Sequence, residues 1–271
     1  MAMNPRDEKK AMLIDTTRCI GCRSCQVACK QWHELSAEKT LFFNGSGYQN
    51  PPNLSEDTYT LVTYTEIEDK DKISWTFVKR QCMHCDEPAC VAACLVGALT
   101  KSPTGAVVYD KSRCIGCRYC LLACPWEIPK YQWRTPLPYV CKCDLCETRL
   151  IAGVLPACAK ACPSGAIKFG NKTELLAEAG KRIKMHPDKY INHIYGEKEA
   201  GGTSVLYLSA VPFDKLGFPR VPDYPRAFFS DRVMHVLPYW SLCLGIFLSG
   251  LYWHSERKTR VSETERKEPS T

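Results

Sequence analysis

Sixteen of the 18 cysteines in this 271-residue chain fall into four groups of four, an arrangement suited to binding metal clusters through thiolates. The first and third groups share the spacing C-x2-C-x2-C-x3-C, and the second and fourth have longer middle gaps. In chain order the quartets are Cys19, Cys22, Cys25 and Cys29; Cys82, Cys85, Cys90 and Cys94; Cys114, Cys117, Cys120 and Cys124; Cys143, Cys146, Cys158 and Cys162. A cubane iron–sulfur cluster takes one soft thiolate at each of its four iron corners. The sequence therefore predicts four clusters, and such a chain is most simply interpreted as a carrier of electrons.

The fourth cysteine of a quartet can bind a different cluster from the first three. A tight loop with cysteines at i, i+3 and i+6 wraps three corners of one cluster, whereas the fourth cysteine enters a helix that leads away. In two-cluster ferredoxins this cysteine binds the other cluster, and a proline often follows it. Pro125 and Pro163 follow quartets three and four in this way. Residues 82–124 therefore look like one complete two-quartet ferredoxin unit.

Two other uses of clustered cysteines fit less well. A disulfide framework needs an oxidising compartment and is typical of much smaller domains. Zinc ribbons use paired C-x2-C knuckles with four ligands in all, which leaves the third and fourth cysteines of quartets one and three unexplained. The spacing of quartet four, read alone, also suits zinc.

Two cysteines lie outside the quartets. Cys141 precedes Cys143 by two positions and in principle could replace it as a ligand, but only Cys143 keeps the i, i+3 spacing to Cys146. We therefore expect Cys141 to be a small buried residue. Cys243 lies in a long apolar run and is expected to face lipid or to be packed.

Composition and charge exclude several classes of function. The net charge is +7, and basic residues are spread among the cysteine loops rather than gathered into a nucleic-acid-binding stripe. Those at Arg18, Arg23, Lys30, Arg113 and Arg118 either raise cluster potentials or are simply solvated. No catalytic triad, phosphate-binding loop or carboxylate pair accompanies the cysteines, so we expect no catalytic site and no nucleic-acid partner.

Several segments have the patterns of regular elements. Short strands are expected at residues 11–14, 98–100, 106–109, 166–169 and 201–208, and a hairpin at residues 59–78 with its turn at 68–71. Asn171, with Glu174 three residues later, predicts the start of a helix that carries an apolar face. Residues 211–232 form a proline-rich connector.

Residues 233–253 contain no Asp, Glu, Lys or Arg and are rich in aliphatic and aromatic side chains. At ~1.5 Å per residue this segment forms roughly 31 Å of helix, which matches the hydrocarbon core of a bilayer. A buried core helix is the alternative, but no polar stripe runs along the segment. Pro238 fits the first turn if the helix begins near Leu237. We expect residues 254–271 to be a charged tail without regular structure.

The cysteine segments resemble a known family, the four-cluster β subunits of molybdopterin oxidoreductases. The segments that carry the likeness are residues 19–22, 82–85, 114–117 and 157–163. Within that group the chain looks most like the β subunit of respiratory, membrane-bound formate dehydrogenases. The likeness rests on Gly201-Gly202-Thr203 before a strand, on Asp86-Glu87-Pro88 in quartet two and on one C-terminal membrane helix. Lys30 and Leu95 depart from the pattern, because they replace the prolines that would follow quartets one and two.

The resemblance implies a nested set of ligands, in which quartet one shares ligands with quartet four, and quartet two with quartet three. We name the implied clusters A to D. Their ligands would be Cys19, Cys22, Cys25 and Cys162 for cluster A; Cys29, Cys143, Cys146 and Cys158 for cluster B; Cys82, Cys85, Cys90 and Cys124 for cluster C; Cys94, Cys114, Cys117 and Cys120 for cluster D. All four would be [4Fe-4S] clusters.

The same resemblance implies an α+β fold of two ferredoxin-like two-cluster modules, one inserted in the other, plus one C-terminal transmembrane helix. The outer module would comprise residues 1–30 and 131–210, and the inner module, with its preceding insertion, residues 31–130. The connector, helix and tail would be residues 211–232, 233–253 and 254–271.

The implied function is electron transfer from a catalytic α subunit, which oxidises formate at molybdopterin-bound molybdenum or tungsten, to a membrane cytochrome b γ subunit and so to quinone. The alternative is the same role beside a hydrogenase or a nitrate, polysulfide or sulfoxide reductase. We expect a single-pass protein of the cytoplasmic membrane in anaerobic respiration. Residues 1–10 carry no export signal, so a periplasmic globular part would cross the membrane with a signal-bearing partner.

Overall fold

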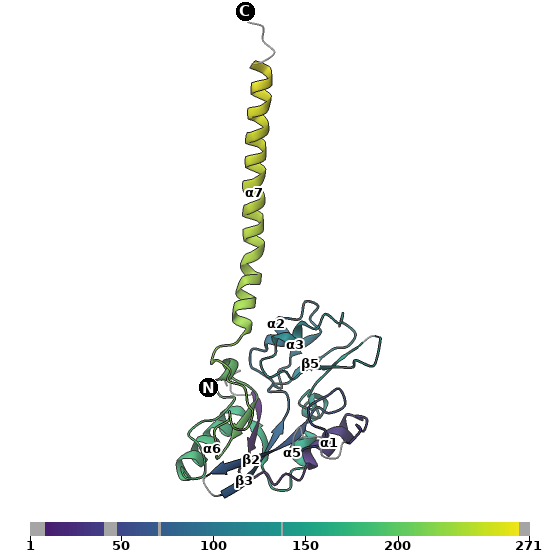
Figure 1. Ribbon diagram of the computed structural model, residues 1–271, viewed down its shortest axis with the longest axis vertical. Helices are drawn as coiled ribbons and strands as arrows, with labels where there is room; N and C mark the ends of the chain where they lie inside the picture. Colours follow the sequence, from purple (N-terminus) through teal and green to yellow (C-terminus); the bar gives the residue numbers. More distant parts are fainter. Residues whose placement is uncertain (1–8, 41–47, 70–71, 137, 266–271) are drawn as a thin grey trace, which may run out of the picture. The chain divides into compact units, whose positions relative to one another are not determined.

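The computed structural model describes residues 9–40, 48–69, 72–136 and 138–265 (Figure 1). The chain forms two compact units, residues 1–227 and residues 228–271, and each is described by itself. The first unit contains all four quartets.

A three-stranded sheet joins distant parts of the first unit. Strand β1 (Lys10–Asp15) lies between β8 (Ile167–Asn171), which is antiparallel to it, and β9 (Val205–Leu208), which is parallel. All residues of β1 after Lys10 are buried, because the sheet is covered on both faces. The strands expected at residues 11–14 and 166–169 are thereby confirmed, within one or two residues. The strand expected at residues 201–208 begins four residues later, because a 3₁₀ turn extends to Gly201 and Gly202 has a positive φ.

Helix α6 (Lys172–Met185) covers one face of this sheet with Leu175, Ala179 and Ile183. The Asn171 side chain caps it by accepting a hydrogen bond from the Thr173 amide, as predicted. At the end of β1 the carboxylate of Asp15, 1% exposed, accepts hydrogen bonds from Arg182, Tyr190 and Thr17. The helix is therefore anchored to the sheet by both apolar packing and a buried ion pair.

Three hairpins make up the other strands of the described chain. The long one pairs β2 (Leu61–Asp69) with β3 (Lys72–Arg80), as expected, although residues 70–71 of its turn lie outside the described residues. The second pairs β4 (Leu99–Lys101) with β5 (Val107–Tyr109), also as expected. The third, β6 (Lys130–Tyr131) with β7 (Val140–Cys141), was not predicted, because each of its strands has only two residues.

Short helices follow the cysteine loops. They are α1 (Ser24–Trp32), α2 (Ala89–Ala92), α3 (Tyr119–Ala123), α4 (Glu147–Ile151) and α5 (Ala157–Lys160), with a 3₁₀ turn, η2, at Glu199–Gly201. Arg23, Arg118 and Cys146 immediately precede α1, α3 and α4 and adopt left-handed backbone conformations. This shared conformation reverses the chain sharply between the loop and the helix.

The second unit is helix α7 (Ala227–Glu265), which begins ten residues earlier than the Leu237 start expected from the sequence. Pro238 therefore lies inside the helix and not in its first turn. The helix also continues into the segment expected to be an unstructured tail, because Glu, Lys and Arg favour helices and Arg260 pairs with Glu256 one turn earlier. The last six residues, 266–271, lie outside the described residues.

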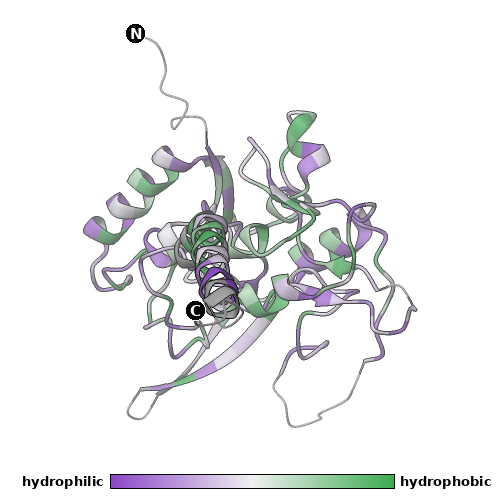
Figure 2. Cartoon of the chain, turned by 90° about the horizontal axis from the view of Figure 1, so that it is seen from above, coloured by the Kyte–Doolittle hydropathy of each residue, from purple (hydrophilic) through white to green (hydrophobic). Residues whose placement is uncertain are grey.

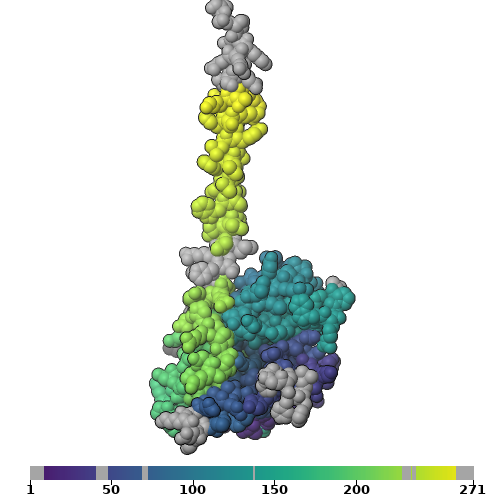
Figure 3. All heavy atoms as spheres, viewed as in Figure 1, coloured from purple at the N-terminus to yellow at the C-terminus, as the bar shows by residue number. Residues whose placement is uncertain are grey.

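One helix among the described residues, at Val236–Arg260, is long and apolar enough to cross a membrane. Figure 2 looks along α7 and shows hydrophobic (green) and hydrophilic (purple) segments of it in turn. Described side chains along this stretch, including Leu242, Ile246 and Phe247, are exposed, and the helix forms the yellow-green column of Figure 3. Cys243 is exposed among them. Apolar exposure of this length supports a membrane anchor at the C-terminal end.

Candidate metal centres

The predicted ligands lie in loops and in the short helices, and α1 carries two of them, Cys25 and Cys29. Half of them are buried, namely Cys25, Cys29, Cys82, Cys90, Cys120, Cys143, Cys146 and Cys158, whereas Cys22 and Cys117 are exposed. All 16 are free thiols despite their crowding. Cys141 is buried in β7, as expected, and its Sγ lies 3.9 Å from the carbonyl oxygen of Tyr139.

The first three cysteines of quartet one lie beside the last cysteine of quartet four. Burial raises the pKa of the Cys19 thiol, and the neighbouring charges of Cys162 and Cys22 raise it further. Burial likewise raises the pKa of Cys25 to about 12, with contributions from Cys158, Cys19 and Cys162. The thiols of Cys19, Cys22, Cys25 and Cys162 thus form one crowded group.

The last cysteine of quartet one lies among the other members of quartet four. Burial raises the pKa of Cys29 to about 12, and the charges of Cys158 and Cys146 contribute to the increase. Burial also raises the pKa of Cys143, where Cys29 is the largest charged contributor. Cys29, Cys143, Cys146 and Cys158 therefore form a second group.

Quartets two and three have the same reciprocal arrangement. Burial raises the pKa of Cys85, and the charges of Cys82, Cys124 and Cys90 add to it. Burial raises the pKa of Cys120 to about 11, and its charged neighbours are the other members of a fourth group, Cys117, Cys114 and Cys94. The third and fourth groups thus also take three cysteines from one quartet and one from another.

Some thiols also neighbour a different group. The charge of Cys158 acts on Cys25, that of Cys82 on Cys143, and that of Cys120 on Cys90. The first group thus neighbours the second, the second the third, and the third the fourth. Cys22 and Cys117, the exposed thiols, belong to the first and fourth groups.

The donor sets fit iron–sulfur clusters. Four converging thiolates without a cation repel one another and lose their hydration, which explains the raised pKa values. Iron binding removes both penalties, because the metal takes up the thiolate charge and needs soft sulfur donors. When bound, such clusters supply reversible one-electron transfer.

Three buried or half-buried lysines lie near the thiol groups, and none of them was predicted from the sequence. Lys79 on β3 is fully buried. The buried Nζ of Lys142 donates a hydrogen bond to the carbonyl oxygen of Cys143 at 2.9 Å. Lys101 donates to the carbonyl oxygens of His84 and Gly105, and burial lowers the pKa of Lys101 to about 8. Charge alone gives no sign of burial, so the sequence held no signal that could separate these lysines from surface ones.

Two histidines also lie beside the ligands. His84 is fully buried, and its Nε2 is 3.5 Å from Sγ of Cys143. His33 Nε2 lies 3.2 Å from Asp144 and 4.0 Å from Sγ of Cys146. Burial opposes protonation of His33, but the hydrogen bond to Asp144 raises its pKa to about 9.

Some of the dispersed basic residues are bound to protein groups. Arg23 Nε donates to the hydroxyl of Tyr64, and Lys30 Nζ donates to the carbonyl oxygen of Asp57. Arg118 lies over the ring of Trp133 at 4.3 Å. These side chains are therefore positioned and not simply solvated.

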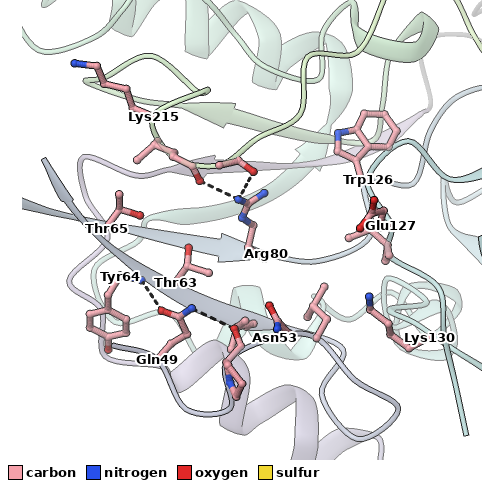
Figure 4. Close-up of a pocket in the computed structure, with 16 residues that line it drawn as sticks. Gln49, Asn53, Thr63, Tyr64, Thr65, Arg80, Trp126, Glu127, Lys130 and Lys215 are labelled. Carbon is pink, nitrogen blue, oxygen red and sulfur yellow. Dashed lines mark hydrogen bonds between the residues drawn. The ribbon is translucent and has the colours of Figure 1, made fainter. Parts of the chain in front are cut away.

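A hollow of about 900 Å³ is lined by residues of β2, by Arg80 of β3 and by the segments 126–130 and 215–217, among others (Figure 4). Arg80 crosses it and donates hydrogen bonds to the carbonyl oxygens of Leu216 and Gly217. Trp126, on another side, donates to Tyr195 and packs against the small apolar cluster that includes Cys82. The lining is mixed in polarity, and its lining residues form no set of nucleophile and base.

Comparison with known proteins supports iron–sulfur binding by the cysteine quartets. The 4Fe-4S dicluster domain family matches twice, over residues 18–98 and residues 73–172. Two dicluster domains hold four [4Fe-4S] clusters.

Several relatives are similar to this chain over most of its length. A Nitratidesulfovibrio vulgaris protein is 40% identical over 95% of this chain and 70% of its own length. The hydrogenase-2 operon protein HybA of Escherichia coli O157:H7 is 36% identical over 92% of this chain and 84% of its own. The formate dehydrogenase-O iron–sulfur subunit of Escherichia coli K12 is 40% identical over 74% of this chain and 67% of its own length. The chain therefore belongs to the family of the formate dehydrogenase iron–sulfur subunits, with HybA as a further relative, and it transfers electrons within an oxidoreductase complex.

Proposed function

We propose that the four thiol groups are the ligand sets of clusters A to D as defined above. The observation that carries the proposal is the convergence of 16 free thiols into four groups that each cross two quartets. The pairing of β1 with β8 and β9 supports the nested modules, because it joins residues 1–30 to the region 131–210. Residues 31–130 then form the inserted part.

We infer that electrons pass through the clusters in the order A, B, C and D or the reverse. Neighbouring thiols connect A to B, B to C and C to D. The exposed Cys22 and Cys117 belong to clusters A and D, so these two clusters are the ones that partner subunits can approach. This chain holds the clusters, shields the middle two from water and supplies buried positive charge.

The cluster assignment is tested by iron and acid-labile sulfide analysis of the anaerobically purified chain. We expect about 16 irons and 16 sulfides per chain, since each cubane holds four of each. A few zinc ions in place of iron would reject the proposal, and so would half the expected iron.

We further propose that the donor is a molybdopterin α subunit that oxidises formate and that the acceptor is a cytochrome b γ subunit in the membrane. Three relatives named as formate dehydrogenase iron–sulfur subunits, at 38–40% identity, support this proposal. A hydrogenase partner is the second candidate, because the likeness to HybA extends over more of this chain.

Copurification decides between the two partners. The complex solubilised from membranes should contain a molybdopterin subunit and reduce a dye with formate. A nickel–iron subunit and dye reduction by hydrogen would select the hydrogenase alternative.

We propose that α7 anchors the complex in the cytoplasmic membrane, with residues 1–227 on the periplasmic side. The exposed apolar stretch Val236–Arg260 supports the anchor. Deletion of residues 233–271 should move the chain from the membrane to the soluble fraction. The side is tested in spheroplasts, in which added protease should degrade residues 1–227; full protection would reverse the orientation.

A further inference from the structure

Lys79 is a buried cation that has no hydrogen-bond partner among the described residues. It lies on β3, its side chain is 1% exposed, and its Nζ is sealed from solvent. An ammonium without a partner in an apolar interior is strongly unfavourable. Its position therefore indicates that an anionic group nearby compensates its charge without a hydrogen bond from Nζ to a described side chain.

The hairpin holds Lys79 against the helix that carries two predicted ligands. Lys79 pairs with Val62 across β2 and β3, and the Val62 amide donates to Gln26 Oε1 at 3.4 Å. Gln26 belongs to α1 and lies between Cys25 and Cys29 in sequence. On the other side, the Tyr207 hydroxyl donates to the carbonyl oxygen of Lys79 at 2.8 Å. The backbone of Lys79 is thus fixed from both sides.

The charges around Lys79 come from two thiol groups. Burial opposes the ammonium, but Cys158, Cys25 and Cys143 raise the pKa of Lys79 above its ordinary value. Reciprocally, Lys79 counteracts the increase in the pKa of Cys19 and of Cys29. Two of these five cysteines belong to the set of cluster A and three to that of cluster B.

We propose that Lys79 is the internal counter-cation of clusters A and B, whose positive charge raises both of their reduction potentials. Reduction adds a negative charge to a cluster, and a fixed positive charge nearby stabilises that reduced form more than the oxidised one. The inference rests on the proposed ligand sets. It adds a specific role for one residue that ligates no iron.

Redox titration of the whole complex, followed by EPR, tests the role of Lys79. Lys79→Met keeps the length of the side chain and removes the charge, so the midpoint potentials of two clusters should fall while the other two stay unchanged. Lys79→Arg should restore much of the loss. Lys184→Met is the matched control, because Lys184 is exposed on α6 and its replacement removes the same net charge; its four potentials should equal those of the wild type.

Unchanged potentials in Lys79→Met with full iron content would overturn the proposal. If Lys79→Met loses iron, Lys79→Gln provides the same test while retaining an N–H donor, and wild-type potentials in that variant would also overturn it. Cys124→Ser identifies the EPR signal of cluster C. If the potential shift in Lys79→Met is confined to that signal, the charge of Lys79 acts on cluster C and the assignment to clusters A and B is rejected. Failure of the proposed function would be distinguishable from failure of this inference, because the wild-type complex itself would then contain fewer than four clusters.

Discussion

Replacement of His84 by asparagine should lower the reduction potential of the cluster that Cys143 binds. The amide of Val107 donates to His84 Nδ1 at 2.9 Å, and an amide N–H can only donate. The ring proton of neutral His84 therefore resides on Nε2, which faces Sγ of Cys143 at 3.5 Å. Burial lowers the pKa of His84 well below its usual value, so the ring is neutral and the N–H···S bond is its only means of stabilising the thiolate.

The size of the effect follows from the strength of that bond. A hydrogen bond to a charged group contributes about 1.5–3 kcal/mol, and only the part that differs between the oxidised and reduced cluster changes the potential. If half of it differs, the change is about 0.75–1.5 kcal/mol, which corresponds to roughly 30–65 mV for one electron. A shift of this size is measurable by EPR-monitored titration.

The matched variant is His84→Gln. Asparagine presents an oxygen near the position of Nδ1 and still accepts from Val107, but it does not reach Cys143. Glutamine places an amide N–H near the position of Nε2 and should recover most of the potential. His84 has a left-handed backbone (φ 49°), a conformation that asparagine tolerates. Equal potentials in His84→Asn and the wild type, with all iron retained, would refute the reasoning.

Three further outcomes are expected. Cys162→Ser should alter the EPR signal of the cluster held by quartet one, and a change confined to the quartet-four cluster would contradict the crossed ligands. Asp15→Asn removes the anion of a buried ion pair with Arg182 and should cost about 3 kcal/mol, seen as a lower thermal midpoint of the cluster-loaded chain. Burial opposes ionisation of Glu178, but hydrogen bonds from Lys168 and Arg182 hold its pKa below the ordinary 4.5. Glu178→Gln should therefore lower the thermal midpoint at pH 7, and the difference should vanish as the pH falls below that lowered pKa; a difference that persists in acid would show that charge is not its cause.

The cysteine quartets were recognisable because the spacing of ligands along a chain is a local property, whereas the crossed ligand sets were expected only from the family resemblance. A loop can present three thiols to one cluster only at a few separations, so Cys114, Cys117 and Cys120 are informative without any structure. The longer hairpin and the capped start of α6 were predictable for the same reason, since alternation of side chains and an Asn cap act over a few residues.

The roles of Lys79 and His84 were not predictable, because both depend on contacts between distant segments. Lys79 has the sequence context of any strand lysine, and only its register with Val62 turns it towards the cysteine loops. His84 looks like an ordinary residue between two ligands until Val107 fixes its tautomer. Helix α7 is longer than expected because apolar composition locates only the candidate membrane span, whereas the helix continues into charged sequence at both ends.

The central strand of the sheet has a consequence for how the protein is made. Strand β1 is synthesised first, but it pairs with β8 and β9, the last of which ends at Leu208. At roughly 5–20 residues per second, a ribosome needs on the order of 10–40 s to reach that point. During that interval the earliest thiols emerge from the ribosome without their sheet partners. The proposed ligand sets of clusters A and B draw on quartets one and four, so neither set is complete until the chain has been made at least as far as Cys158.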